Sequence, residues 1–241
     1  MRVLALAGLS TTLLGTAVAE IESEFHVGYS SDYIFRGADL GGDLYEFGLD
    51  FAGSGDVQGL GAFDWSAGVW YASIDANGGA ANSSTNELDV YGGVSKSLND
   101  MFAVAVGITN YSYFGNGAAG GTNDDIEPYV SIGAEVAGIS LGAAAHFDGA
   151  NNYAHDLYYE FTASYERELG ENLSGGIELV LGYFDDSNAV PGDDSDVFFG
   201  GTASLSYAVS DNITVSPYAS LTFSDNLGDH FFGGVSVGFG F

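Results

Sequence analysis

The sequence predicts an all-β protein, a single antiparallel transmembrane β-barrel of about twelve strands. Three observations lead to this prediction. Hydrophobic residues alternate with small or polar ones along almost the whole chain. The connections between the alternating stretches are long and short in alternation, and the chain begins with the pattern of a secretory signal peptide.

Residues 1–19, MRVLALAGLSTTLLGTAVA, have the three parts of a signal peptide. A single early charge, Arg2, precedes an apolar stretch, and the run Ala17-Val18-Ala19 supplies a small-residue cleavage site. A membrane-anchor helix is the alternative, but polar residues at positions 10–12 interrupt the apolar run. We therefore expect an exported protein whose mature chain, residues 20–241, begins at Glu20 and forms one barrel.

Apolar residues recur at every second position, which is the period of a β-strand, and no helical period is sustained after the signal. In FDWSAGV, residues 63–69, the odd-numbered positions are apolar and the even-numbered ones are acidic or small. About twelve such stretches of ~10 residues are expected of a transmembrane barrel. They cover residues 25–29, 45–51, 63–71, 87–94, 102–108, 126–133, 139–146, 157–165, 173–183, 197–207, 213–221 and 233–241.

The connections between these stretches alternate in length. The odd-numbered ones are long and rich in glycine or acid: Tyr33–Asp43, Ser73–Asn86, Phe114–Asp125, Gly149–His155, Asp185–Asp196 and Ser224–Asp229. The even-numbered ones are short, at Lys96–Asp100, Ala137–Gly138, Glu168–Asn172 and Ser210–Asn212, with Gly53–Gly61 as the exception. Short periplasmic turns opposite long external loops are typical of outer-membrane barrels.

A soluble β-sandwich or lipocalin-like barrel would show the same alternation with its apolar face turned inward. The signal peptide and the alternating connections favour a face turned outward, towards lipid. So does the opposite face, which is built largely of Gly, Ser and Ala. The last strand keeps its alternation to the chain end, with Phe239 and Phe241 on the apolar face. We expect Phe241 to lie in lipid beside the first strand, and both aromatic residues to signal insertion to the barrel-assembly machinery.

The amino-acid composition excludes some classes of partner and some kinds of chemical site. Lys and Arg total 4 against 33 Asp and Glu, so the formal charge is −29, which excludes nucleic acid because binding it needs many basic contacts. Cysteine is absent, which excludes disulfides and thiolate metal sites. The acid excess also fits life in salty water, where counterions screen self-repulsion.

Nine carboxylates fall on the face expected to line the pore, where acids concentrate cations and repel anions. They are Glu24, Glu46, Asp50, Asp64, Glu87, Asp89, Glu127, Glu160 and Glu178. The alternative is that they are merely the wetted face of an acidic barrel. Arg36, the only base expected on the external side, either lines and narrows the pore or pairs with Asp32 or Asp39 to hold the first loop. We favour that local pairing, because a lone base among acids finds a partner.

Other candidate chemistry is weak. The loop Asp185–Asp196 is acidic enough to bind calcium, but it matches no EF-hand spacing, so we expect a solvated loop. The four histidines, His26, His146, His155 and His230, show no metal spacing, although His146 near Asp148 could pair with a loop serine as in barrel lipases or proteases. We expect no cofactor, no metal site and no catalysis.

Two motifs resemble a known family. SSDYIFRGADLGGD, residues 30–43, and NELDVYGGVSKSLND, residues 86–100, are similar to motifs of the TorF-type porins, also described as the Gcw_chp family. The resemblance implies an outer-membrane channel and is concentrated in those two motifs.

Together these features predict a porin-like channel for passive diffusion of small hydrophilic solutes, with a preference for cations. Its expected partners are outer-membrane lipid, the assembly machinery and the solutes themselves. About twelve strands with small inward residues are expected to leave an open lumen. A barrel enzyme and a structural or adhesive barrel are the alternatives. The sequence leaves open whether barrels group into trimers.

Overall fold

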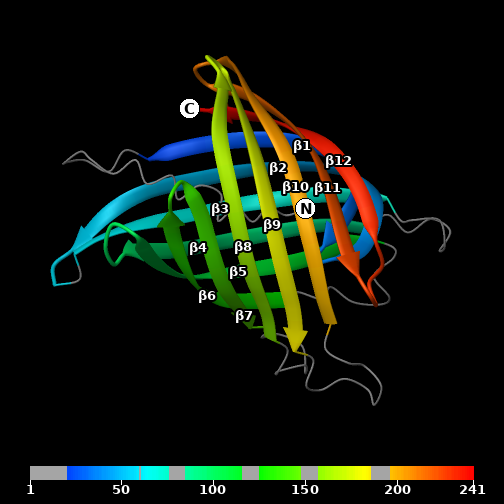
Figure 1. Ribbon diagram of the computed structural model, residues 1–241, viewed down its shortest axis with the longest axis horizontal. Helices are drawn as coiled ribbons and strands as arrows, with labels where there is room; N and C mark the ends of the chain where they lie inside the picture. The colour runs from blue at the N-terminus through cyan, green and yellow to red at the C-terminus, as the bar shows by residue number, and fades with distance from the viewer. Residues whose placement is uncertain (1–20, 60, 76–84, 116–124, 148–156, 186–195) are drawn as a thin grey trace.

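The protein is a closed barrel of twelve antiparallel strands, which confirms the predicted fold class. The computed structural model describes residues 21–59, 61–75, 85–115, 125–147, 157–185 and 196–241. The strands are β1 (Glu22–Phe35), β2 (Ala38–Val57), β3 (Gly61–Asp75), β4 (Thr85–Ser97), β5 (Phe102–Gly115), β6 (Asp125–Val136), β7 (Ile139–Phe147), β8 (Leu157–Gly170), β9 (Leu173–Asp185), β10 (Asp196–Ser210), β11 (Ile213–Ser224) and β12 (His230–Gly240). In Figure 1 the front wall, β8 to β12, runs across the rear wall, β1 to β5.

Each strand pairs with its neighbours in the chain, and β1 pairs with β12 to close the barrel. At this seam Phe25 lies opposite Phe239, and their rings stack with centroids 6.1 Å apart. The last residue continues the ladder, because the Phe241 N–H donates to the carbonyl of Ser23 at 3.0 Å. The chain end is therefore held beside the first strand, while its side chain is 74% exposed.

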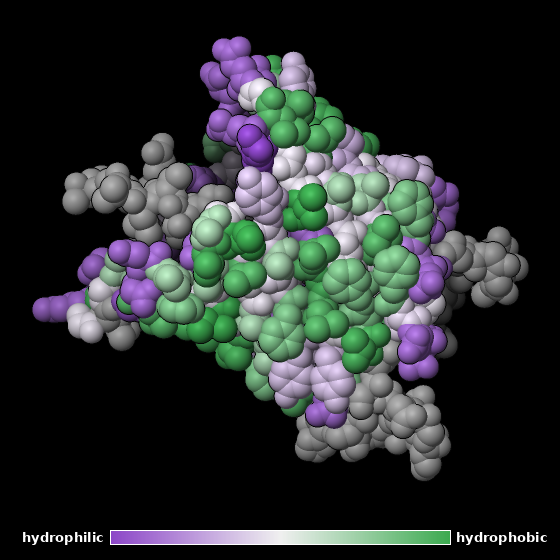
Figure 2. All heavy atoms as spheres, in the orientation of Figure 1, coloured by the Kyte–Doolittle hydropathy of each residue, from purple (hydrophilic) through white to green (hydrophobic). Residues whose placement is uncertain are grey.

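The apolar side chains of the alternating pattern lie on the outside of the barrel. Phe47, Val90, Val106, Phe161 and Ile177 are all exposed, although each sits in the middle of a strand. Figure 2 shows this band of hydrophobic side chains across the wall, with hydrophilic residues gathered towards its margins. Among the described residues, no helix is long and apolar enough to cross a membrane.

The two ends of the barrel differ. We call the end with the connections after β1, β3, β5, β7, β9 and β11 the loop end, and the opposite end, where the described chain begins and ends, the turn end. The inner face is packed near the loop end, where Trp70, Tyr111, Tyr158 and Phe198 are buried. Towards the turn end the inner face carries small, half-buried residues such as those at positions 204, 206, 214 and 216.

The prediction of a long first loop at Tyr33–Asp43 is wrong. β1 and β2 continue through it as one hairpin, closed by the two-residue turn Arg36-Gly37. Both turn residues have positive φ, 51° and 83°, as a type I′ turn requires. The sequence suggested a loop because its glycines and acids interrupt the alternation. The expected connection Gly53–Gly61 is likewise shorter, since β2 runs to Val57 and β3 begins at Gly61.

Candidate functional site

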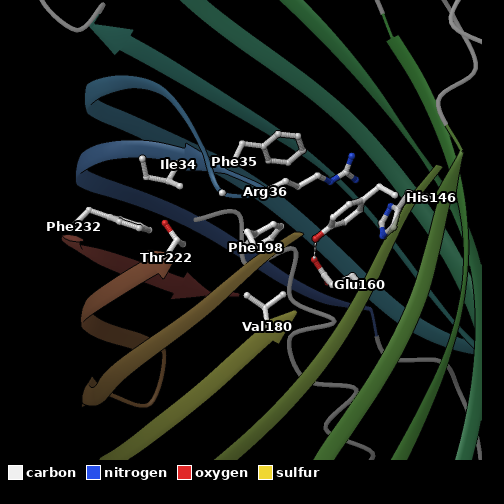
Figure 3. Close-up of a pocket in the computed structure, with 11 residues that line it drawn as sticks. Ile34, Phe35, Arg36, His146, Glu160, Val180, Phe198, Thr222 and Phe232 are labelled. Atoms are coloured by element: carbon white, nitrogen blue, oxygen red, sulfur yellow. Dashed lines mark hydrogen bonds between the residues drawn. The ribbon is translucent and has the colours of Figure 1, made fainter. Parts of the chain in front are cut away.

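The end of the β1–β2 hairpin lies inside the barrel. Beyond the paired residues Tyr33 and Gly41, the segment Ile34–Leu40, which we call the tip, enters the lumen (Figure 3). Ile34 is 2% exposed, although it is part of a hairpin end. The tip therefore occupies part of the lumen within the described residues.

Backbone irregularities beside the tip explain its direction. The register of β1 with β2 shifts between Tyr33 and Ile34, and that of β2 with β3 shifts between Gly42 and Tyr45. Asp43 has a φ of 45°, a value that residues other than glycine rarely adopt. Such irregularities bend a strand and increase its twist. Both strands of the hairpin therefore bend at the same level.

Arg36 fastens the tip to the opposite wall. Its Nη1 donates to Glu127 Oε2 at 2.7 Å and its Nη2 donates to Glu127 Oε1 at 2.6 Å, a bidentate pair with a residue of β6. The guanidinium carbon lies 4.0 Å from the ring centroid of Tyr158 and 4.7 Å from that of Phe35. Both the edge and the faces of the guanidinium group are thus engaged.

Glu127 is surrounded by further polar partners. Tyr111 donates its hydroxyl to Glu127 Oε1 at 3.1 Å, and His146 Nδ1 lies 2.9 Å from the same oxygen. The side chains of Arg36 and Glu127 are only 12% and 6% exposed. Removing one charge of a buried pair costs about 3–5 kcal/mol, because the other charge is left uncompensated. We call Glu127, Tyr111, His146 and Tyr158 the wall site.

The expected pairing of Arg36 with Asp32 or Asp39 is therefore wrong. Asp39 accepts a hydrogen bond from the backbone N–H of Gly41 at 3.0 Å, and Asp32 accepts one from the Ser31 hydroxyl at 2.8 Å. These short side chains are used locally, whereas the bend in the hairpin aims Arg36 across the lumen. The expectation that Arg36 would find an acidic partner is correct, but its partner lies 91 residues away in sequence.

Other carboxylates of the inner wall accept hydrogen bonds from aromatic side chains of other strands. The Tyr33 hydroxyl donates to Glu87 at 2.8 Å and the Trp70 indole donates to Glu46 at 2.6 Å. Asp50 accepts a hydrogen bond from Tyr91, and its other oxygen lies 3.2 Å from His26. Tyr33, Trp70 and Tyr91 are neutral donors, so these hydrogen bonds hold the acids in place without adding positive charge.

The remaining carboxylates are spread along the barrel. Glu160 accepts a hydrogen bond from Tyr158 at 2.7 Å, and Asp89 is buried at 2% exposure. Glu24 is exposed near the turn end, and Asp64 and Glu178 are half-buried. The structure thus places Glu46 and Asp50 on β2 and Glu87 and Asp89 on β4, the two strands that flank β3, and it places Glu127 and Glu160 on β6 and β8.

A small pocket of about 50 Å³ separates part of the tip from the wall. Arg36, Gly37, Tyr158, Glu160 and Phe198 are among the residues that line it (Figure 3). A cavity needs roughly 10–15 Å³ to hold a water molecule, so this pocket has room for a few waters and no sugar.

Sequence reasoning missed the aromatic filling of the lumen. An open lumen was expected, but at the loop end Tyr33, Trp70 and Tyr111 are buried around the tip. The signal was present in part, because Tyr91, Tyr129 and Tyr158 interrupt an inner face that is otherwise small or polar. Tyr33 and Arg36 were assigned to an external loop, so their contribution inside the barrel could not be seen.

The histidines and the acidic loop add no metal site among the described residues, where no group of three or more His, Asp or Glu is placed to hold an ion. His230 Nε2 lies 3.0 Å from the carbonyl of Leu227. Asp148, His155 and most of the loop Asp185–Asp196 fall outside the described ranges, as does the expected signal peptide.

Residues 16–184 match the Gcw_chp family, described as a bacterial protein of unknown function. The chain belongs to this family. The match contains both motifs that carry the resemblance, the first of which forms the tip. No curated protein matches the sequence.

Solved structures share the fold at low sequence identity. An outer membrane channel from Pseudomonas putida F1 superposes with a TM-score of 0.58 at 12% identity, over 94% of this chain and 97% of that one. The KdgM porin superposes with a TM-score of 0.50 at 14% identity, over 90% and 98%. A bacterial polysaccharide outer membrane secretin gives 0.51 at 10% identity, over 92% and 98%. These likenesses establish a common barrel architecture.

Replacing Tyr33 by Phe should lower the free energy of unfolding by about 1–3 kcal/mol, because the buried Glu87 loses a hydrogen-bond donor. Tyr45→Phe is the matched control, since that side chain is 58% exposed and should change stability by less than about 0.5 kcal/mol. Urea unfolding of the detergent-solubilised barrel measures both. Equal effects of the two substitutions would contradict the assignment of Tyr33 to the packed lumen.

Proposed function

We propose that the protein is a porin-like channel of the bacterial outer membrane, of the TorF type, through which small hydrophilic solutes diffuse with a preference for cations. The observation that carries the proposal is the closed barrel whose outer wall is apolar and whose inner wall holds carboxylates. A soluble barrel would have the opposite distribution.

The outer wall supports the membrane location. In lipid every backbone polar group must be satisfied within the protein, and a closed ladder does this without an edge. Exposed Phe, Val, Ile and Leu side chains around the wall are favourably solvated by hydrocarbon, whereas so large an apolar surface is unfavourable in water. The turn end would face the periplasm and the loop end the exterior, as in other barrels of this kind.

Charge inside the barrel supports the cation preference. Arg36 is compensated by Glu127, and Arg167 is exposed at the end of β8 nearest the turn end. Glu46, Asp50, Glu87, Asp89 and Glu160 then give the described part of the lumen a negative field. Such a field raises the local concentration of cations and repels anions.

A barrel enzyme would need a nucleophile within hydrogen-bond reach of a base. Among the described histidines, His146 contacts Glu127, His26 contacts Asp50 and His230 contacts a backbone carbonyl. No observation favours catalysis over diffusion.

The exported, mature protein should begin at Glu20, because the small-residue run before it fits a cleavage site. The intact mass of protein extracted from membranes should correspond to residues 20–241. A mass that includes residues 1–19 would show that the segment is retained.

Deleting Phe241 should sharply reduce the amount of assembled barrel, while export of the chain continues. The Phe241 side chain is exposed and its N–H completes the ladder with Ser23, so the loss in stability should be small. The larger effect would come from lost recognition by the assembly machinery. The heat-modifiable band on gels measures assembly, and Phe231→Ala, another exposed phenylalanine of β12, is the control.

Neutralising three lumen acids together, Glu46→Gln, Asp50→Asn and Asp89→Asn, should reduce cation preference severalfold and change conductance less. The substitutions remove charge at nearly constant volume and keep an acceptor oxygen for Trp70 and Tyr91. The reversal potential of a planar bilayer under a KCl gradient is the measurement. The preference should also weaken at high salt, because the Debye length falls from ~10 Å at 0.1 M to ~3 Å at 1 M.

The control neutralises three exposed acids near the turn end, Asp56, Glu171 and Asp211, which should leave the lumen field largely intact. An open channel without ionic preference would refute the role of the lumen acids alone. A membrane with no conductance at all would refute the channel.

A further inference from the structure

The tip is a small element with a hinge at its base. The pair Tyr33 and Gly41 marks the last regular level of the hairpin, and register shifts fall next to it in both strands. Gly41 and Gly42 stand at the bend on β2, and Gly41 has a φ of 156°. Glycine tolerates changes of backbone direction that other residues resist. The segment Ile34–Leu40 can therefore change its angle while the strands below it stay paired.

Side chains of the tip contact the wall in charged and apolar ways. Arg36 pairs with Glu127, and Phe35 makes an edge contact with Tyr111 at a centroid distance of 6.2 Å. Gly37 lies against Phe198, so that a Cβ added there would meet the Phe198 ring at 2.8 Å. Asp39 and Leu40 are exposed. Arg36 thus makes the charged part of the attachment, to which Ile34 and Phe35 add apolar contacts.

The wall site has the form of a receptor for that group. Glu127 presents both oxygens in the plane of the guanidinium, Tyr158 presents a ring face, and Tyr111 fixes the carboxylate from β5. A planar bidentate carboxylate beside an aromatic face suits a guanidinium ion better than an ammonium ion. All of these wall residues belong to β5, β6, β7 and β8, and would keep their places if the tip moved away.

We propose that the wall site is a guanidinium-binding site, that Arg36 is its built-in occupant, and that this occupancy latches the tip across the channel as a gate. The proposal rests on the channel function and adds to it a ligand class and a moving element. With the tip in place, the pocket beside it has a volume of about 50 Å³, and we expect only water and small ions to pass the tip. With the tip released, larger uncharged solutes can pass.

Two single substitutions separate a gate from a fixed charge. Arg36→Gln and Glu127→Gln should each raise conductance severalfold and admit a neutral disaccharide in liposome swelling, because each breaks the latch. Their ionic preferences should move in opposite directions. Arg36→Gln leaves Glu127 uncompensated and strengthens cation preference, whereas Glu127→Gln leaves Arg36 uncompensated and weakens it.

The double variant Arg36→Gln/Glu127→Gln carries no uncompensated charge, so it guards against misfolding of the single variants. It should show the raised conductance with the ionic preference of the unaltered protein. Arg167→Gln is the matched control, since it removes an exposed arginine far from the wall site and should leave conductance unchanged. Equal conductance of the unaltered protein and both latch variants would overturn the gate.

Binding to the vacated site has its own measurement, which does not depend on conduction. In Arg36→Gln, millimolar L-arginine should raise the urea midpoint of unfolding, because a ligand that binds only the folded state stabilises it. Citrulline, the uncharged isostere of arginine, should have no such effect, and the double variant should not respond to arginine. A response to arginine that survives Glu127→Gln would overturn the site. Absence of current with arginine binding intact would refute the channel and leave the site standing.

Discussion

Closure of the hydrogen-bonded ladder is the constraint on which the rest of the structure depends. A strand edge cannot face lipid, because no water is present to satisfy its N–H and C=O groups. The ladder therefore continues to the chain end, where Phe241 donates to Ser23 after the last residue of β12. Closure also explains why apolar side chains reach the carboxyl terminus: every strand must carry an outward apolar face over its whole membrane-crossing length.

Closing twelve strands creates a lumen that strand side chains of small size do not fill, whereas about eight strands can be filled by side chains alone. Near the loop end the protein fills the space with the tip and with aromatic residues of the wall. This arrangement brings an arginine into a region of low water content among carboxylates. Its pairing with Glu127 satisfies both charges, and the aromatic faces of Phe35 and Tyr158 cover the guanidinium planes.

Local alternation was sufficient to predict the strands and their approximate number, whereas the side of the wall on which apolar residues lie was predicted from the signal peptide, the alternating connections and the small residues of the opposite face. Local alternation failed at residues 33–43, because it reports which face a residue takes and not whether the strand itself bends. Two glycines, an acid with positive φ and a type I′ turn look like a loop in sequence and form a bent hairpin in the structure. The partner of Arg36 was beyond prediction, since Glu127 becomes a neighbour only when the barrel closes around the tip.

Because basic residues are scarce, the Arg36–Glu127 pair can specify the position of the tip. A lumen with many mixed charges would offer the tip several attachments of similar energy, and its position would be poorly specified. Here Arg36 meets a carboxylate already oriented by Tyr111 and His146, which favours one position over others. A bidentate, stacked arginine is also a poor candidate for replacement by lysine, whose ammonium group cannot match both carboxylate oxygens in one plane. The same pair that specifies where the tip lies also compensates the positive charge that the tip brings into the lumen.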